Sequence, residues 1–195
     1  MKRALVIVVL AYAVMLASPL PLLAQDADAT PQPTPSDWMV YEDPAMHFRA
    51  PDGFRPVGQR QIDVQKLTDD PTIVAAWVQP DPNHPRRLVV EQEYFEGDYQ
   101  AFEAQLESSL RDQFDDPFFK GKQQTKLRNG MPAEFMEMSS GSGFNVQKFY
   151  ILLWADGQRG VAILLQTQLN DLDGDAARRL MSDVTAVRYP VGRDQ

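Results

Sequence analysis

Residues 145–154 read NVQKFYILLW and residues 159–167 read RGVAILLQT, with Asp156–Gly157 between them. An Asp-Gly pair between two apolar runs is typical of the tight turn of a β-hairpin. The central residues of the runs, 149–154 and 161–165, are apolar at consecutive positions, which indicates strands buried on both faces. The sequence therefore predicts a β-sheet that other elements cover on each side.

More strands are predicted before this hairpin. Asn129–Gly130 is a second hairpin turn, and it separates strands predicted at Thr125–Arg128 and Ala133–Met138. Residues 72–79 (TIVAAWVQ) and 87–95 (RLVVEQEYF) are rich in apolar and β-branched side chains, and the loop Asp81–Pro85 (DPNHP) lies between them. Both are therefore predicted to be strands.

The ordered domain is expected to begin with another hairpin. A short strand ending at Tyr41 is followed by a turn at Glu42–Pro44 and a second strand at His47–Arg49. Ala50–Phe54 (APDGF) then supplies the proline and glycine of a tight turn, which ends the second strand.

Two helices are predicted, each with an aspartate as N-cap. After Asp98 the apolar residues recur at helical spacing, and Asp115–Pro117 ends that helix; its apolar face consists of Tyr99, Phe102, Leu106, Leu110 and Phe114. A final helix is expected at Gly174–Val184, after Asp173. Strands with two apolar faces and helices around them predict an α+β fold, an antiparallel β-sheet flanked by helices in an α/β/α sandwich.

The N-terminus has the pattern of an export signal. Lys2 and Arg3 precede an unbroken apolar run at Ala4–Ala17, which is short for a membrane span. Pro19 and Pro21 break the helix before Ala24, so cleavage is predicted after Ala24. The alternative is an uncleaved anchor that tethers the protein.

These signals divide the chain into four parts. Residues 1–24 are the predicted signal peptide, and residues 25–37 form a flexible linker rich in Pro, Thr and Asp. Residues 38–190 are expected to form a single domain, and residues 191–195 a tail. The mature protein is then expected in the periplasm or outside the cell, without a stable membrane anchor.

The composition limits which classes of partner and which cellular compartment are expected. The chain has 27 acidic and 19 basic residues, so it repels phosphate backbones, and nucleic acid is not expected as a partner. It has no cysteine, which excludes thiol catalysis and lipid attachment through a lipobox. An exported chain without disulfides favours a bacterial source.

The motifs that usually carry catalysis or a metal are incomplete. Ser139–Gly143 (SSGSG) lacks the Gly-x-Ser-x-Gly spacing of a serine hydrolase, and only His47 and His84 could act as its base. If Gly174 is the sixth residue of a calcium loop, leucines occupy the first and twelfth positions, where oxygen ligands are needed. Helix capping explains the nearby acids, and a weak surface Ca²⁺ site is the alternative. No catalytic, cofactor-binding or metal-binding residue is assigned.

One aromatic and basic cluster follows the longer predicted helix: Phe118, Phe119, Lys120 and Lys122. One interpretation is that both rings pack beneath the end of the helix, as apolar residues beside helices usually do. The other is that the cluster is a docking patch for a protein partner.

The order of these elements resembles the PsbP-like family, which includes extrinsic photosystem II subunits, a Ran-binding nuclear transport factor and small exported bacterial proteins. Tyr41 followed by residues 47–54 (HFRAPDGF) is similar to the opening hairpin of that family, and residues 129–133 (NGMPA) to its central turn. The resemblance implies an α/β/α sandwich that binds or assembles rather than catalyses.

The leading hypothesis is an exported, non-catalytic accessory domain that binds a protein or envelope partner, with no cofactor. Two alternatives stay open. One is an exported hydrolase with a dispersed carboxylate site, because carboxylates are abundant. The other is a carrier of a small apolar ligand in a cleft between sheet and helix.

Overall fold

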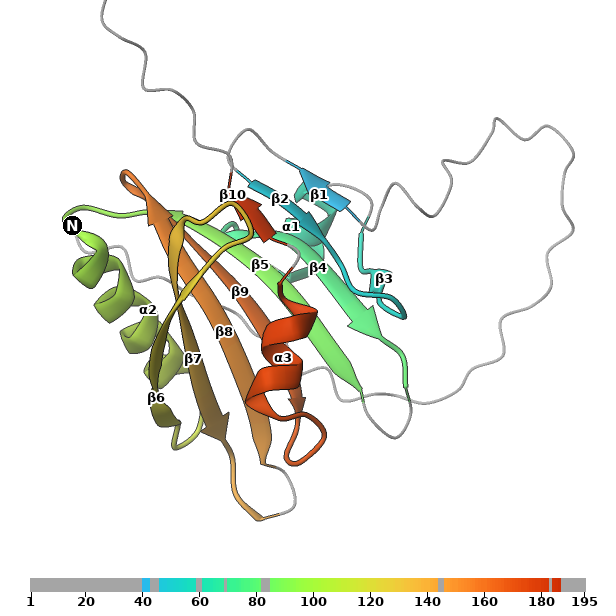
Figure 1. Cartoon of the computed structure of the whole chain (residues 1–195). Helices are drawn as coiled ribbons and strands as arrows, with labels where there is room; N and C mark the ends of the chain where they lie inside the picture. The colour runs from blue at the N-terminus through green and yellow to red at the C-terminus, as the bar shows by residue number, and fades with distance from the viewer. Residues whose placement is uncertain are drawn as a thin grey trace, which may run out of the picture.

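Seven strands form one antiparallel sheet in the order β3-β4-β5-β9-β8-β7-β6 (Figure 1). Their bounds are Arg55–Pro56 (β3), Ile73–Gln79 (β4), Arg86–Tyr94 (β5), Phe118–Lys126 (β6), Pro132–Ser140 (β7), Gln147–Asp156 (β8) and Arg159–Gln168 (β9). A second sheet has the order β1-β2-β10, with bounds Val40–Glu42, Met46–Arg49 and Val184–Ala186. The helices are α1 (Gln61–Thr68), α2 (Tyr99–Gln113) and α3 (Gly174–Leu180).

The computed structural model describes residues 40–42, 46–58, 61–68, 70–81, 85–143, 146–182 and 184–186. The predicted signal peptide, its cleavage after Ala24, the linker at 25–37 and the tail at 191–195 lie outside the described residues. Within the part that is described, no helix is both long enough and apolar enough to cross a membrane.

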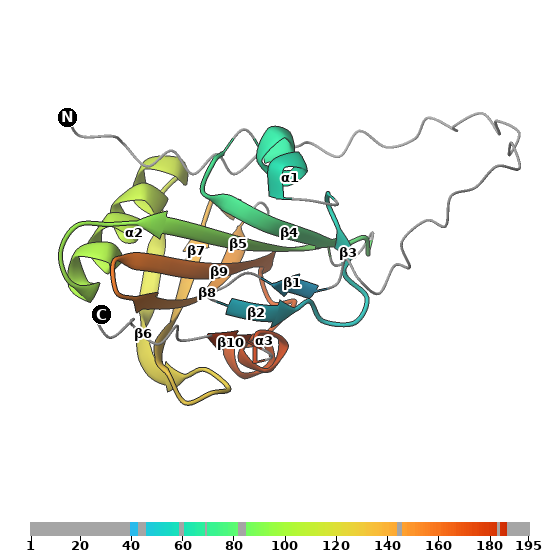
Figure 2. The ribbon, with the colours of Figure 1, turned by 90° about the horizontal axis from the view of Figure 1, so that it is seen from above.

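Helices and the small sheet cover the two faces of the large sheet, which confirms the predicted α+β class. α1 and α2 lie on one face, and α3 with β1, β2 and β10 lies on the other (Figure 2). Beneath α2 the core contains side chains such as Phe102, Leu106 and Ile151. On the opposite face the core includes Phe48 of β2 and Met181, which follows α3.

The hairpin that organises the sheet forms as predicted. β8 and β9 pair from Gln147 and Gln168 to Asp156 and Arg159, around the turn at Gly157, whose φ of 62° favours glycine. Alternate residues of each strand enter opposite cores: Ile163 and Leu165 face α3, whereas Ala162 and Leu164 face α2. The continuous apolar run of each strand therefore supplies side chains to the cores on both faces of the large sheet.

Both predicted helix caps are present. The carboxylate of Asp98 accepts a hydrogen bond from the backbone N–H of Ala101 at 3.0 Å. The carboxylate of Asp173 accepts one from the N–H of Ala176 at 2.7 Å. Each cap satisfies a donor that the first helical turn leaves unpaired.

Several features differ from the prediction, among them β3 and the separate sheet of β1, β2 and β10, which were not predicted. α1 has no counterpart in the sequence analysis. The strand predicted at Thr125–Arg128 begins much earlier, at Phe118. The final helix ends at Leu180 instead of continuing to Val184, because Val184–Ala186 pairs with β2 in antiparallel register. This pairing joins the two ends of the described chain in one sheet.

Candidate binding cleft

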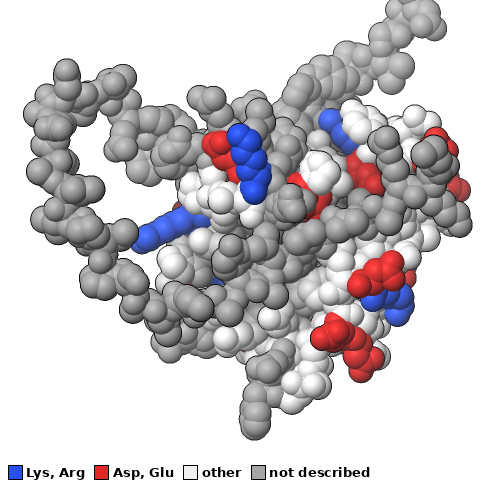
Figure 3. Space-filling model, turned by 180° about the vertical axis from the view of Figure 1, so that it is seen from behind, with Lys and Arg blue, Asp and Glu red and all other residues white. Residues whose placement is uncertain are grey.

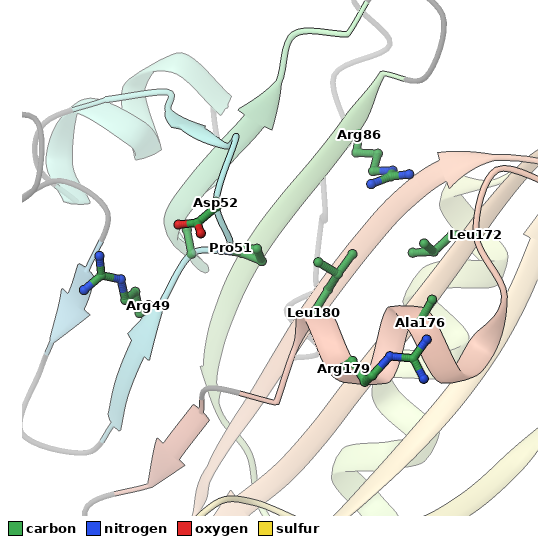
Figure 4. Close-up of a pocket in the computed structure, with 9 residues that line it drawn as sticks. Arg49, Pro51, Asp52, Arg86, Leu172, Ala176, Arg179 and Leu180 are labelled. Atoms are coloured by element: carbon green, nitrogen blue, oxygen red, sulfur yellow. The ribbon is translucent and has the colours of Figure 1, made fainter.

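An open cleft of about 510 Å³ lies between α3 and the turn that follows β2 (Figure 4). The turn, the start of β5, the loop before α3 and α3 itself all contribute lining residues, which are Arg49, Ala50, Pro51, Asp52, Arg86, Leu172, Ala176, Arg179 and Leu180. Segments far apart in the sequence therefore build one hollow, and its volume lies within the usual range of ligand sites.

Local structure fixes both walls of the cleft. On one side, the N–H of Phe54 donates to the carbonyl of Pro51 at 3.3 Å, and Gly53 has a φ of 88°, which a tight turn requires. On the other side, α3 turns Ala177 into the core, so Ala176 and Leu180, four residues apart, share the face that lines the cleft.

Arg86 belongs to the cleft wall but its charge is already balanced. Its Nε and Nη2 atoms donate to the two carboxylate oxygens of Asp171 at 2.7 and 3.2 Å. Asp171 also accepts a hydrogen bond from the hydroxyl of Thr167. The hydrogen bond to Asp171 raises the pKa of Arg86. This forked ion pair fixes the loop before α3 against β5.

The rim of the cleft holds two guanidinium groups that have no such partner. Arg49 and Arg179 are both exposed, and neither forms an ion pair with another described residue. Among the lining residues that the structure describes, Asp52 is the only acid. In Figure 4, Arg49 and Asp52 lie on one side of Leu180, and Arg86 and Arg179 on the other. The rim is therefore net positive in a chain whose formal charge is −8.

The structure divides the cluster predicted from Phe118, Phe119, Lys120 and Lys122 between the two faces of β6. Phe119 packs against the core beneath α2, with the guanidinium of Arg111 4.6 Å from its ring centre. The ammonium of Lys122 contacts Glu103 and Glu107 of α2. Lys120 is 3.2 Å from Glu137, on the α3 side. Phe118 is 66% exposed, so only one of the two rings packs beside the helix.

The carboxylates of Asp70, Glu91 and Glu93 lie near one another beneath α2. Glu91 on β5 is 6% exposed, and Asp70, before β4, is 1% exposed; Glu93 accepts a hydrogen bond from Gln105 of α2 at 2.6 Å. Burial, and then the charges of Asp70 and Glu93, raise the pKa of Glu91 to about 8. The void beside Glu91 has a volume of only about 10 Å³, so a substrate has no room there.

A second acidic group lies between α2 and the neighbouring strands. Gln124 of β6 donates to a carboxylate oxygen of Glu134 on β7. Burial, followed by the nearby Glu103, raises the pKa of Glu134. With Lys122 held by Glu103, these contacts connect α2 to the edge of the sheet. Seen from behind, acidic and basic side chains of the described residues lie near one another (Figure 3).

The acids near the start of α3 have structural roles. Asp171 holds Arg86, Asp173 caps the helix, and Asp175 lies 3.8 Å from Arg178. Within the described ranges, no three His, Asp or Glu side chains are placed so that they could hold a metal ion. Of the two histidines, His47 lies on β2, half-buried, and His84 lies outside the described residues.

The sequence alone does not indicate the cleft. Residues 47–54 indicate only a fold pattern, and no local signal marks Arg179. The sequence does contain a basic residue, Arg49, next to a Pro-Asp-Gly turn. That residue indicates a binding site only once the structure shows that α3 lies opposite the turn. The relevant proximity is created by the fold, not by the sequence spacing.

A central antiparallel sheet with helices on both faces is the architecture of a PsbP-like α/β/α sandwich. Cyanobacterial PsbP (CyanoP) from Synechocystis has a similar structure, with a TM-score of 0.51 and 10% identity over 75% of this chain and 91% of CyanoP. This similarity confirms the fold that the sequence resemblance implied. At this identity it shows the fold alone, because one fold serves many functions.

Two other solved structures are similar over comparable lengths. The Ran-binding protein Mog1p of Saccharomyces cerevisiae has a TM-score of 0.49 and 11% identity, covering 73% of this chain and 90% of Mog1p. LpqN, described as involved in cell envelope biogenesis of Mycobacterium tuberculosis, has a TM-score of 0.44 and 15% identity, covering 74% and 86%. No family model and no curated protein matches the sequence.

Proposed function

We propose that this protein is an exported, non-catalytic accessory domain that binds a protein or envelope partner through the cleft beside α3. The observation that supports a binding role is the cleft itself, whose lining includes apolar side chains and two exposed arginines that form no ion pair with another described residue. Solvent-exposed cations of this kind are accessible to an anionic group, and ordering each side chain on binding costs about 0.5–1.5 kcal/mol. Export rests on the signal pattern of residues 1–24.

The buried carboxylates favour a second candidate, a hydrolase, because a glutamate with a pKa near 8 has the proton affinity of a general acid or base. Catalysis also requires that a substrate reach the carboxyl group. The void between Glu91 and Phe102 of α2 has the volume of about one water molecule, so this requirement is not met. A carrier of an apolar ligand fails at this position for the same reason.

The proposal predicts that partner binding depends on the two rim arginines. The double variant Arg49→Glu/Arg179→Glu is expected to retain at most about a tenth of the partner captured by the wild-type protein, because each reversal replaces attraction with repulsion. The measurement is quantitative crosslinking and affinity capture from the source organism, and mass spectrometry also reports the mature N-terminus.

The matched control is Lys66→Glu/Lys126→Glu, which reverses two exposed charges away from the cleft. This variant is expected to capture partners as the wild-type protein does. If both double variants lose partners equally, net charge governs the interaction, and the cleft is not the binding site.

A further inference from the structure

We infer that the cleft beside α3 recognises an acidic peptide segment in which carboxylates flank an apolar side chain. This inference rests on the proposed binding function and names the chemistry of the partner.

The charge balance of the lining favours an anionic ligand. Of the three arginines, Arg86 is neutralised by Asp171, which leaves Arg49 and Arg179 against the single carboxylate of Asp52. A guanidinium group offers parallel N–H donors that match the two oxygens of a carboxylate. The surplus of positive charge is local, because the chain as a whole is acidic.

The floor of the cleft favours an apolar group between the charges. Leu172 and Leu180 are half-buried and pack against the core on the α3 side, and they leave part of their surface to the cleft. Pro51 and Ala176 add apolar surface without polar side-chain atoms. An aliphatic side chain placed on this floor would remove apolar area from water, at about 25 cal/mol per Å².

The form of the cleft favours an extended chain. The cleft is open to solvent, and its volume of about 510 Å³ suits a few side chains rather than a folded domain. Arg49 and Arg179 lie on opposite sides of Leu180, and their side chains extend away from it (Figure 4). An extended segment that crosses Leu180 would therefore place an apolar residue over it and a carboxylate near each arginine.

The test uses the exported protein and the pentapeptide Asp-Glu-Leu-Asp-Glu-amide with fluorescein on its N-terminal amine, with binding followed by fluorescence anisotropy. The neutral peptide Asn-Gln-Leu-Asn-Gln is expected to bind at least about tenfold more weakly, and the peptide with serine in place of leucine about threefold more weakly. Raising the salt concentration from 50 to 500 mM is expected to lower the affinity for the acidic peptide about tenfold, because salt screens the attraction between exposed charges.

Variants locate the bound peptide. Arg49→Glu and Arg179→Glu are each expected to weaken binding about tenfold, whereas Lys66→Glu/Lys126→Glu leaves it unchanged. Arg49→Lys is expected to retain most of the affinity, because it keeps the charge and loses only the forked geometry. Circular dichroism of each variant shows whether the fold is intact.

Two results would overturn the inference. One is equal binding of the acidic and neutral peptides, or binding that does not depend on Arg49 and Arg179. The other is that vesicles of phosphatidylglycerol bind at these arginines while the acidic peptide does not, which would assign the cleft to a lipid headgroup. If partner capture depends on both arginines and the peptide fails to bind, the ligand class is wrong and the proposed binding function stands.

Discussion

Between pH 4.5 and pH 7, burial of Glu91 is expected to lower the free energy of unfolding of the wild-type protein by about 3 kcal/mol, and Glu91→Gln is expected to abolish this decrease. In the folded protein the pKa of Glu91 is raised from 4.5 to about 8, first by burial and then by the charges of Asp70 and Glu93. Folding therefore favours the protonated carboxyl. Its contribution to stability is fully present below pH 4.5 and is lost as the pH rises toward 8, at about 1.4 kcal/mol per pH unit.

Urea unfolding at several pH values between 4.5 and 9 measures this effect. The wild-type protein is expected to lose stability relative to Glu91→Gln as the pH rises, since glutamine stays neutral in that range. Glu96→Gln, which changes an exposed glutamate in the loop after β5, is the control and should follow the wild-type curve. If the Glu91→Gln curve runs parallel to that of the wild-type protein, Glu91 is ionised in the folded state.

Gly160→Ala is expected to lower the free energy of unfolding by about 3 kcal/mol, the upper end of the usual cost of overpacking. A Cβ atom at this position on β9 would lie 2.2 Å from the ring of Phe102 on α2. That ring cannot move away easily, because it is 3% exposed and stacks on Phe95 with 5.3 Å between the ring centres. The added methyl group must therefore displace the helix or strain the sheet.

A double-mutant cycle separates this steric clash from a general preference for glycine at position 160. In the background Phe102→Leu, which has a smaller side chain, Gly160→Ala is expected to cost at least about 1 kcal/mol less than in the wild-type background. Thermal and urea unfolding of the wild-type protein, the two single variants and the double variant give the coupling free energy between positions 160 and 102. Equal costs in both backgrounds would show that Phe102 does not require glycine beneath it.

Local sequence chemistry predicted the elements that have strong local signals. The hairpins around Asp156–Gly157 and Asn129–Gly130 were identified because short turns need these residues, and the long helix because Asp98 precedes a regular apolar face. β6 was predicted too short because it lies at the edge of the sheet. Most of its side chains are exposed, so its sequence lacks the apolar alternation of a half-buried strand.

Features that depend on distant pairing could not be predicted. α1 is a short helix in which Val64 packs against the core at the β4 edge, and a helix of that length has little local signal. The end of α3 is set by the pairing of Val184–Ala186 with β2, which overrides local propensity. The cleft depends on the same pairing of distant segments, since Arg49 and Arg179 line one cleft only when α3 lies beside the turn after β2.

Site-specific photocrosslinking in the source organism tests most directly whether the cleft is the binding site. A benzophenone side chain replaces either Ala176, which lines the cleft, or Ala104, an exposed alanine of α2 on the opposite face of the sheet. The proposal predicts a protein adduct from position 176 that is lost in the Arg49→Glu/Arg179→Glu background, and no such adduct from position 104. An adduct that forms equally from both positions, or that persists after the charge reversal, would contradict it.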